Sequence, residues 1–190
     1  MMNTRLGWTA LFAAGLVWVW PNEARADGCD GRPGALVADL GLHVIAAGYQ
    51  HRLDCELVVS ASAGLYAPWT VDRDVWGLGG GDRPPAADIR GVMGRGRFFV
   101  FPWADAPRGP WLSPYAQAGW ASGTVDGESK SGGAFAAGLS AGYTFGLGES
   151  WLLGLGLGGQ YHLVSLDHQT RYPGFLRFGP TVDIFLGYAL

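Results

Sequence analysis

Residues 176–190 read Leu176-Arg-Phe-Gly-Pro-Thr-Val-Asp-Ile-Phe-Leu-Gly-Tyr-Ala-Leu190. Large apolar residues alternate here with small or polar ones, which is the two-residue period of a β-strand and not the period of a helix. One face would carry Leu176, Phe178, Val182, Ile184, Leu186, Tyr188 and Leu190, and the other Arg177, Gly179, Thr181, Asp183 and Gly187. The stretch therefore predicts a strand with one strongly apolar face.

The same alternation recurs along the chain from residue 34 onward. Further strands are predicted within residues 36–52, 56–69, 89–101, 111–122, 134–145 and 151–163. Shorter connections lie at residues 53–54, 102–110 and 146–150, and the polar, Gly-rich and mostly longer ones at residues 71–87, 123–132 and 167–174. The alternation of strands and turns indicates an all-β protein.

The second face of each strand decides between two all-β architectures. A soluble sandwich or barrel would have a charged, solvated outer face, whereas a membrane barrel turns its large residues toward lipid and fills its interior with small or polar ones. The second faces here carry mostly Gly, Ser, Ala, Thr and Gln, and only 15% of the chain is charged while 32 of 190 residues are Gly. Because every backbone group in lipid needs a partner, the strands must close on themselves. We predict a single antiparallel up-and-down transmembrane β-barrel, and a soluble exported β-domain remains the alternative.

Seven strand segments are clear, but single-chain bacterial barrels have an even number of strands. We therefore predict eight strands, with residues 36–52 holding two short strands or with a further strand near residues 31–38. If both termini face the periplasm, the loops at 71–87, 123–132 and 167–174 are extracellular. Aromatic residues near the segment ends are predicted to form an interfacial girdle: Tyr66, Trp69, Trp103, Trp111, Trp120, Trp151 and Tyr188.

Residues 1–26 have the features of a secretory signal peptide. Arg5 precedes an apolar run from Leu6 to Trp20, and Ala24-Arg25-Ala26 is a small-x-small cleavage site. The run is shorter than the ~20 residues of a spanning helix, which disfavours an uncleaved anchor. We expect a signal peptide at 1–26, a barrel domain at 27–190, and export to the outer membrane.

Export also bears on the two cysteines, Cys29 and Cys55. In an oxidising compartment such a pair is a candidate disulfide, although two free thiols remain the alternative until their separation is known. The four His residues show no metal-ligand spacing, and the Gly-rich stretches lack the context of a phosphate loop. We therefore expect no metal and no cofactor.

With these features the chain resembles the small outer-membrane β-barrel proteins of Gram-negative bacteria, the OmpA/OmpX-like group. The resemblance rests on the signal peptide, the alternating strands and the terminal strand 180–190, which is similar to the signal that the barrel-assembly machinery recognises. That family usually ends in Phe or Trp, whereas this chain ends in Leu190. The stretches 111–119 and 158–162 look like myxobacterial-type barrel proteins. The resemblance implies outer-membrane lipid and the assembly machinery as partners and implies no activity.

The inward faces predict a polar network. An eight-stranded barrel is just wide enough inside for side chains, and charges there must be paired. The alternation of side chains between the two faces of a strand, here called parity, also places His43 and Tyr115 inside. The predicted network joins Asp39, Glu56, Arg95, Arg97, Gln117, Gln160, His162, Arg177 and Asp183. The favoured interpretation is a plug of salt-bridged side chains, and the alternative is a narrow gate or a polar ligand cavity.

An enzymatic role is weighed against this structural one. His162, Ser165, Asp167 and His168 lie close in sequence, but His162 and Ser165 differ by three positions and so point to opposite faces of a strand. They do not match the His-x-Ser arrangement of lipid A deacylases. We therefore predict no catalytic residue, with a lipid-modifying enzyme as the alternative.

The charge balance limits the partners. The net charge is −3, and the 13 basic residues include a single Lys. Nucleic-acid binding requires a clustered basic face, so no nucleic acid is expected. Loops on a rigid scaffold commonly carry binding, which makes the loop 71–87, with Trp76, the candidate for outside contacts. No residue identifies that extracellular partner.

Overall fold

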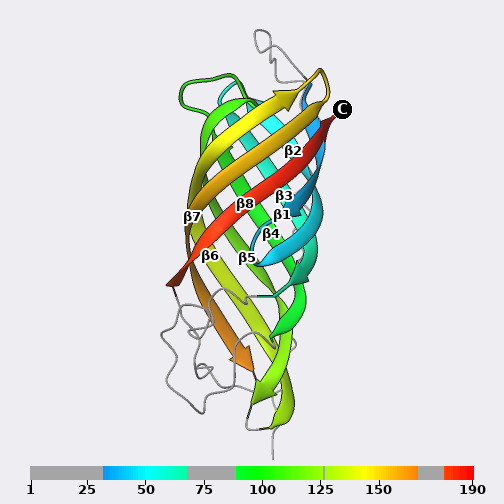
Figure 1. The fold of residues 1–190 in the computed structure, drawn as a ribbon, viewed down its shortest axis with the longest axis vertical. Coiled ribbons are helices and arrows are strands. Elements are labelled where there is room, and N and C mark those ends of the chain that lie inside the picture. Colours follow the sequence, from blue (N-terminus) through cyan, green and yellow to red (C-terminus); the bar gives the residue numbers. More distant parts are fainter. Residues whose placement is uncertain (1–31, 68–88, 126, 167–177) are drawn as a thin grey trace, which may run out of the picture.

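The computed structural model describes residues 32–67, 89–125, 127–166 and 178–190, which form a closed antiparallel β-barrel (Figure 1). Each strand pairs with its neighbours in the chain, and β8 closes the barrel against β1. The strands are β1 Gly34–Leu40, β2 Val44–Asp54, β3 Leu57–Tyr66, β4 Arg90–Val100, β5 Gly109–Val125, β6 Glu128–Leu147, β7 Trp151–Leu166 and β8 Phe178–Ala189. The prediction of an eight-stranded up-and-down barrel is confirmed. Within the part of the chain described, no helix is long and apolar enough to cross a membrane.

The extra strand comes from the long first segment. Residues 36–52 divide between β1 and β2, which pair from Gly34↔His51 to Leu40↔Ile45 across a turn at residues 41–43. The first of the two arrangements considered for this segment is therefore the observed one. The signal peptide at 1–26 lies outside the described residues.

The register of the strands fixes the width of the barrel. From Leu36, the paired residues can be followed around all the strands to Phe178 on β8. Leu36 itself pairs with Tyr188, ten residues farther along β8. Eight strands with a shear of ten residues are strongly tilted and enclose an interior that side chains can fill.

The two ends of the barrel differ. One end, here called the turn end, holds residue 32, Leu190 and the connections β2–β3, β4–β5 and β6–β7; the opposite end is the loop end. The first turn-end connection was predicted at residues 53–54 and lies at Cys55 and Glu56. The Asp54 carboxylate accepts a hydrogen bond from the Cys55 amide at 2.7 Å, which caps the turn there.

At the loop end, the predicted loop 123–132 is wrong. β5 and β6 continue through it and pair as far as Val125↔Glu128. Gly127 has a φ of +78°, a conformation that glycine adopts without strain and that a tight hairpin requires. The loops predicted at 71–87, with Trp76, and at 167–174 lie outside the described residues.

The outer surface carries the large apolar side chains. Ile45, Leu65 and Leu157 are more than 60% exposed, and each of the remaining strands also carries exposed large apolar residues. Trp103, Trp120, Trp151 and Tyr188 are also exposed, as expected for a girdle. The predictions for Tyr66 and Trp111 are wrong: both are inward-facing by parity and are buried inside the barrel. Trp69 lies outside the described residues.

Candidate functional site: the charged barrel interior

Strand alternation turns every second residue into the barrel, and the inward residues fall into layers. Toward the turn end, an aromatic layer is formed by Phe99, Phe101, Trp111 and Phe185 together with Val58 and Ala106. Toward the loop end, an apolar layer contains Val44, Ala46, Tyr66, Ile89, Met93, Ala121, Ala134, Val164 and Leu166. The charged and amide side chains lie between these two layers.

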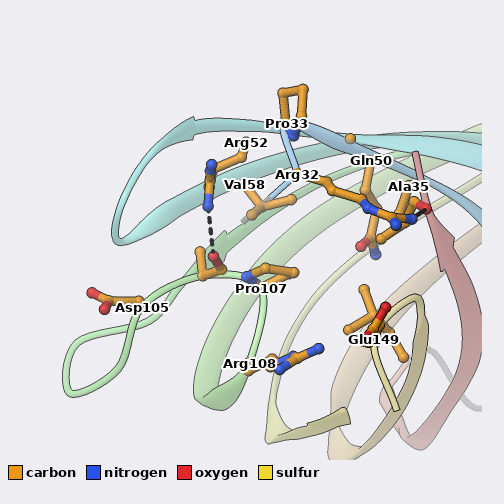
Figure 2. A pocket seen from close by; sticks show the side chains of 14 residues that line it. Arg32, Pro33, Ala35, Gln50, Arg52, Val58, Asp105, Pro107, Arg108 and Glu149 are labelled. Atoms are coloured by element: carbon orange, nitrogen blue, oxygen red, sulfur yellow. Dashed lines mark hydrogen bonds between the residues drawn. The ribbon is translucent and has the colours of Figure 1, made fainter. Parts of the chain in front are cut away.

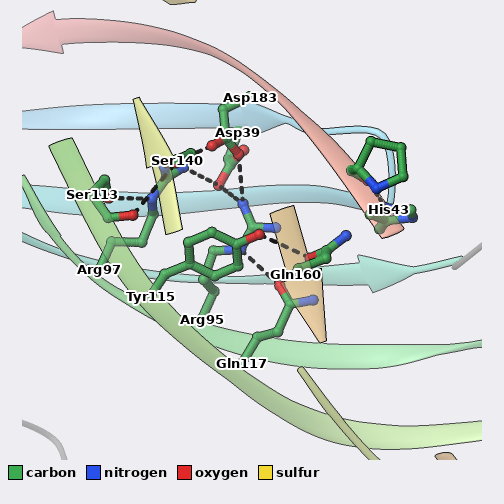
Figure 3. Close-up of polar contacts among 11 residues, drawn as sticks. Asp39, His43, Arg95, Arg97, Ser113, Tyr115, Gln117, Ser140, Gln160 and Asp183 are labelled. Carbon is green, nitrogen blue, oxygen red and sulfur yellow. Dashed lines mark hydrogen bonds and ion pairs between the residues drawn. The ribbon is translucent and has the colours of Figure 1, made fainter. Parts of the chain in front are cut away.

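Two arginines and two aspartates form the centre of this polar layer (Figure 3). Arg95 Nη1 lies 2.9 Å from Asp39 Oδ2 and 3.5 Å from Asp183 Oδ1. Arg97 Nη2 lies 2.9 Å from Asp183 Oδ2, and its Nη1 lies 4.0 Å from Asp39. The arginines come from β4 and the aspartates from β1 and β8, so the ion pairs cross the interior. The cluster has no formal net charge, which is the arrangement that buried charges require.

Neutral side chains also bind both guanidinium groups. Arg97 donates to the hydroxyl oxygens of Ser113 at 3.2 Å and Ser140 at 2.9 Å. Arg95 Nε donates to Gln117 Oε1 at 2.8 Å. The Tyr115 hydroxyl donates to Gln160 Oε1 at 2.9 Å, and the Tyr115 ring lies 4.9 Å from the Arg95 guanidinium. Each guanidinium is therefore held by charge, hydrogen bonds and aromatic contact.

Glycines make room for the large inward side chains. A Cβ atom at Gly154 would overlap the Phe185 ring, and one at Gly156 would overlap the Trp111 ring. Gly138 leaves space in the same way for the ring of Tyr115. The rings of Phe185 and Tyr115 thus depend on glycines directly paired with them on the neighbouring strand, and the Trp111 ring depends on a glycine two strands away.

A histidine pair lies beside the charge cluster, toward the loop end. The rings of His43 and His162 meet edge to face with centroids 5.1 Å apart, and the Tyr66 hydroxyl lies 3.1 Å from His162 Nδ1. His43 belongs to the β1–β2 turn, and its Nε2 lies 3.3 Å from the Pro180 carbonyl oxygen. Burial, together with the positive charge of Arg95, lowers the pKa of His43 from 6.5 to about 4. His43 is therefore neutral at pH 7.

The structure places most of the predicted network together. Seven residues are buried in the polar layer: Asp39, Arg95, Arg97, Gln117, Gln160, His162 and Asp183. The prediction for Glu56 is wrong, because the β2–β3 turn exposes its side chain to solvent instead of directing it inward. Arg177 lies outside the described residues.

The sequence reasoning missed the two serines that bind Arg97. Ser113 and Ser140 are inward by parity and sit on strands next to one another. Small hydroxyl residues on the inward faces, where a buried arginine needs hydrogen-bond acceptors, were the feature of the sequence that could have identified them. The place of Tyr66 near a segment end favours the girdle, whereas strand alternation turns its side chain inward.

The cluster considered for catalysis does not assemble among the described residues. His162 is fully buried in the interior, whereas Ser165 is on the opposite, outward face of β7 and partly exposed. Asp167 and His168 lie outside the described residues. In the described ranges, no three His, Cys, Asp or Glu side chains are grouped so that they could hold a metal ion.

Cys55 lies in the β2–β3 turn and is disulfide-bonded. Cys29 lies outside the described residues, so the pairing of Cys29 with Cys55 stays a prediction. A bridge at this turn would tie the chain before β1 to the turn end.

Comparison with known proteins identifies the fold. No protein-family model matches the sequence, and no curated protein is similar to it. Among solved structures, the neisserial surface protein A is similar with a TM-score of 0.50 at 10% identity, over 83% of this chain and 94% of that one. The fold is that of a small outer-membrane β-barrel.

Two more structures of such barrels are similar over nearly the same span. CarO of Acinetobacter baumannii has a TM-score of 0.44 at 9% identity, over 84% of this chain and 98% of that one. Ail, the attachment invasion locus protein of Yersinia pestis, has a TM-score of 0.36 at 14% identity, over 83% and 93%. Of these three structures the neisserial protein alone reaches a TM-score of 0.50, and at 10% identity its likeness to this chain extends to the fold only.

The outer-membrane barrel fold agrees with the surface of the molecule. In such barrels an apolar band faces lipid, and aromatic residues lie where lipid meets water. The exposed apolar residues of this barrel, with Trp120, Trp151 and Tyr188 among them, form a surface of that kind. The expected resemblance to small outer-membrane barrels is thus confirmed at the level of the fold.

Proposed function

We propose that the chain is an integral outer-membrane barrel that does not conduct and does not catalyse, with a structural or surface-interaction role. The observation that carries the proposal is the neutral cluster of Arg95, Arg97, Asp39 and Asp183, which spans the interior between two apolar layers. Its partners would be the outer-membrane lipid along the apolar band and, during assembly, the barrel-assembly machinery through β8.

The orientation follows the general design of such barrels, in which short turns face the periplasm. The turn end would be periplasmic and the loop end extracellular. The extended β5–β6 hairpin, which pairs to Val125↔Glu128, would then project outward. A surface role would use this end of the molecule.

The interior supports a plug for an energetic reason. A hydrated ion that crosses the barrel would have to separate Arg97 from Asp183 and also pass the rings of Phe99, Trp111 and Phe185. Breaking a buried ion pair leaves uncompensated charge and costs about 3–5 kcal/mol. Few thermal fluctuations reach that state, so a steady current is not expected.

Catalysis finds no support in the same geometry. A nucleophile and its base must lie within hydrogen-bond reach, and His162 and Ser165 lie on opposite faces of the barrel wall. The buried His162 faces Tyr66 and His43 instead. Unchanged lipid A and phospholipid profiles in cells that overproduce the chain would agree with a non-enzymatic role.

Single-channel recording in planar bilayers tests the plug. We expect the chain to give no stepwise current in potassium chloride. A double variant, Arg97→Ala with Trp111→Ala, removes one member from each of two layers and should give current, while Arg90→Ala at the loop end should not. Stepwise current from the unchanged chain that Arg97→Ala alters would overturn the proposal.

Cell fractionation tests the location. The chain should pellet with the outer membrane and should migrate differently on gels before and after heating, as folded barrels do. Recovery of the chain in the soluble periplasm would contradict the outer-membrane location.

A further inference from the structure

Arg90 is exceptional among the charged residues of the strands. It is the first residue of β4, at the loop end, and it is exposed between the buried Ile89 and the inward Gly91, so its side chain lies on the lipid-facing side of the wall. Asp54 lies at the last position of β2, beside the β2–β3 turn. All other charged residues of the described strands have inward parity: Asp39, Arg52, Arg95, Arg97, Glu128, Lys130 and Asp183.

The charge of Arg90 is not neutralised within the described ranges, where no carboxylate lies within ion-pair distance of it. Its outward neighbour on β5 is Ser122, which is paired with it, and on the β3 side Ala67 follows the partner of Gly91. A charged side chain on the lipid face is costly at the middle of the bilayer and nearly free of cost at its edge. At the end of its strand, the guanidinium therefore lies where lipid headgroups are found.

The outer face beside Arg90 is apolar and hollowed. A cavity of about 430 Å³, here called the rim cavity, is lined by Leu42, Ile45, Leu65, Ala67 and Arg90, among others. Ile45 and Leu65 are paired across β2 and β3 and are 62% and 63% exposed on the lipid-facing surface. The rim cavity is therefore continuous with the apolar band that faces lipid, and its volume is that of a small-ligand site.

The inner side of the rim cavity is closed by buried residues. Val44 and Tyr66 also line it, and both belong to the apolar layer at the loop end of the interior. The Tyr66 hydroxyl lies 3.1 Å from His162 Nδ1, and His43 Nε2 lies 3.3 Å from the Pro180 carbonyl oxygen. A molecule in the rim cavity would thus meet an apolar wall, and the site is separate from the charged plug.

The cavity at the turn end has a different balance of charges (Figure 2). Two exposed arginines, Arg32 and Arg108, border it together with two carboxylates, Asp105 and Glu149. Its third arginine, Arg52, donates to the Ala106 carbonyl oxygen at 3.3 Å. The rim cavity combines an apolar lining with a cation that no described carboxylate balances.

We propose that the rim cavity binds a phosphorylated membrane lipid. One acyl chain lies on Ile45 and Leu65, and phosphate oxygens of the headgroup accept hydrogen bonds from Arg90, whose planar guanidinium matches phosphate in a two-bond geometry. The inference rests on the proposed contact with outer-membrane lipid, and it names the class of lipid and its site. It does not depend on which leaflet the loop end reaches.

Native mass spectrometry of the full chain, released from maltoside micelles, tests the proposal by resolving each bound lipid. In a titration with dimyristoyl phosphatidylglycerol, we expect one adduct to saturate before any further one. Phosphatidylcholine with the same acyl chains has no net charge and should bind about fivefold more weakly. Glycerol phosphate, which has no acyl chain, should give no adduct, and this distinguishes a lipid from free phosphate.

Matched variants separate the two parts of the site. Arg90→Gln should weaken the binding of phosphatidylglycerol about fivefold and abolish the preference over phosphatidylcholine, whereas Arg90→Lys should retain most of that preference. Arg108→Gln removes the same charge at the turn end and should leave the preference unchanged. Ala67→Trp fills the rim cavity and should weaken the binding of both lipids.

An unchanged preference for phosphatidylglycerol in Arg90→Gln would overturn the proposal, as would equal binding of the two lipids by the unchanged chain. If Ala67→Trp prevents folding, seen as loss of heat-modifiable gel mobility, the Arg90 variants still decide. Recovery of the chain in the soluble periplasm would contradict the proposed membrane role as well. A missing lipid preference in a chain that pellets with the outer membrane would refute the rim site alone.

Discussion

Asp183 is the residue whose loss should disturb the interior most. Its carboxylate is fully buried and lies 2.9 Å from Arg97 and 3.5 Å from Arg95. At 2.9 Å and an effective dielectric constant of 20, the attraction to Arg97 is about 6 kcal/mol before desolvation is counted. Asp183→Asn keeps the shape and removes the charge, which leaves two buried guanidinium groups with Asp39 as their carboxylate.

The expected cost of Asp183→Asn is about 3 kcal/mol in the free energy of unfolding. Removing one member of a buried pair costs about 3–5 kcal/mol because the remaining charge is not compensated. The lower end applies here, since Asp39 remains 4.0 Å from Arg97 and the hydroxyls of Ser113 and Ser140 still accept its hydrogen bonds. In urea the unfolded chain exposes these groups to water, so the penalty falls on the folded state.

Urea unfolding from phosphatidylcholine vesicles, followed by gel mobility, measures this cost. Glu128→Gln is the matched control: its side chain is 76% exposed and its ion pair with Lys130 should contribute less than about 1 kcal/mol. Arg97→Met combined with Asp183→Leu should cost less than the two single changes added together, because it removes both charges. A cost for Asp183→Asn no greater than that of the control would refute the assignment of Asp183 to a buried pair.

Three further predictions concern packing and pH. Gly154→Ala should cost about 1–3 kcal/mol, because the new Cβ meets the Phe185 ring, whereas Gly133→Ala enters open space and should cost less than about 1 kcal/mol; urea unfolding compares them. Trp111→Ala should cost about 3–5 kcal/mol in the same assay through the cavity that it leaves. Because burial lowers the pKa of His43 to about 4, the folded state binds fewer protons than the unfolded state between pH 6.5 and 4. The free energy of unfolding should therefore fall as the pH is lowered through that window, by up to about 1.4 kcal/mol per pH unit. His43→Gln should reduce this slope.

The interior of the barrel was predictable because strand parity carries the information. Once residues 176–190 are aligned as a strand, Asp183 must face the same way as Thr181 and Gly187, and the same reasoning turns Arg95 and Arg97 inward. In an interior this narrow, buried charges of opposite sign have to meet. The register needed to choose which aspartate contacts which arginine comes only from the closed sheet.

The wrong predictions arose where strand alternation ends, or where composition or a position near a strand end was given more weight than alternation. Glu56 continues the alternation of β3 backward into a turn, and beyond the last strand residue the alternation no longer fixes the direction of a side chain. Residues 123–132 are rich in Gly and Ser, a composition typical of loops, yet pairing across the hairpin overrides composition there. Trp111 was assigned to the girdle from its position near a strand end, and its true environment depends on the glycines of two other strands.

The high glycine content and the aromatic layer are two parts of one packing solution. A shear of ten residues makes the interior too narrow for large side chains on every wall at one height. Trp111 and Phe185 are accommodated because Gly156 and Gly154, beside them in the barrel wall, carry no side chain, and Tyr115 is accommodated by Gly138 in the same way. Replacing these glycines by larger residues would expel the rings, and replacing the rings by small residues would leave cavities beside the charge cluster. The interior therefore constrains glycine, aromatic and charged positions together, while the outward faces need only remain apolar.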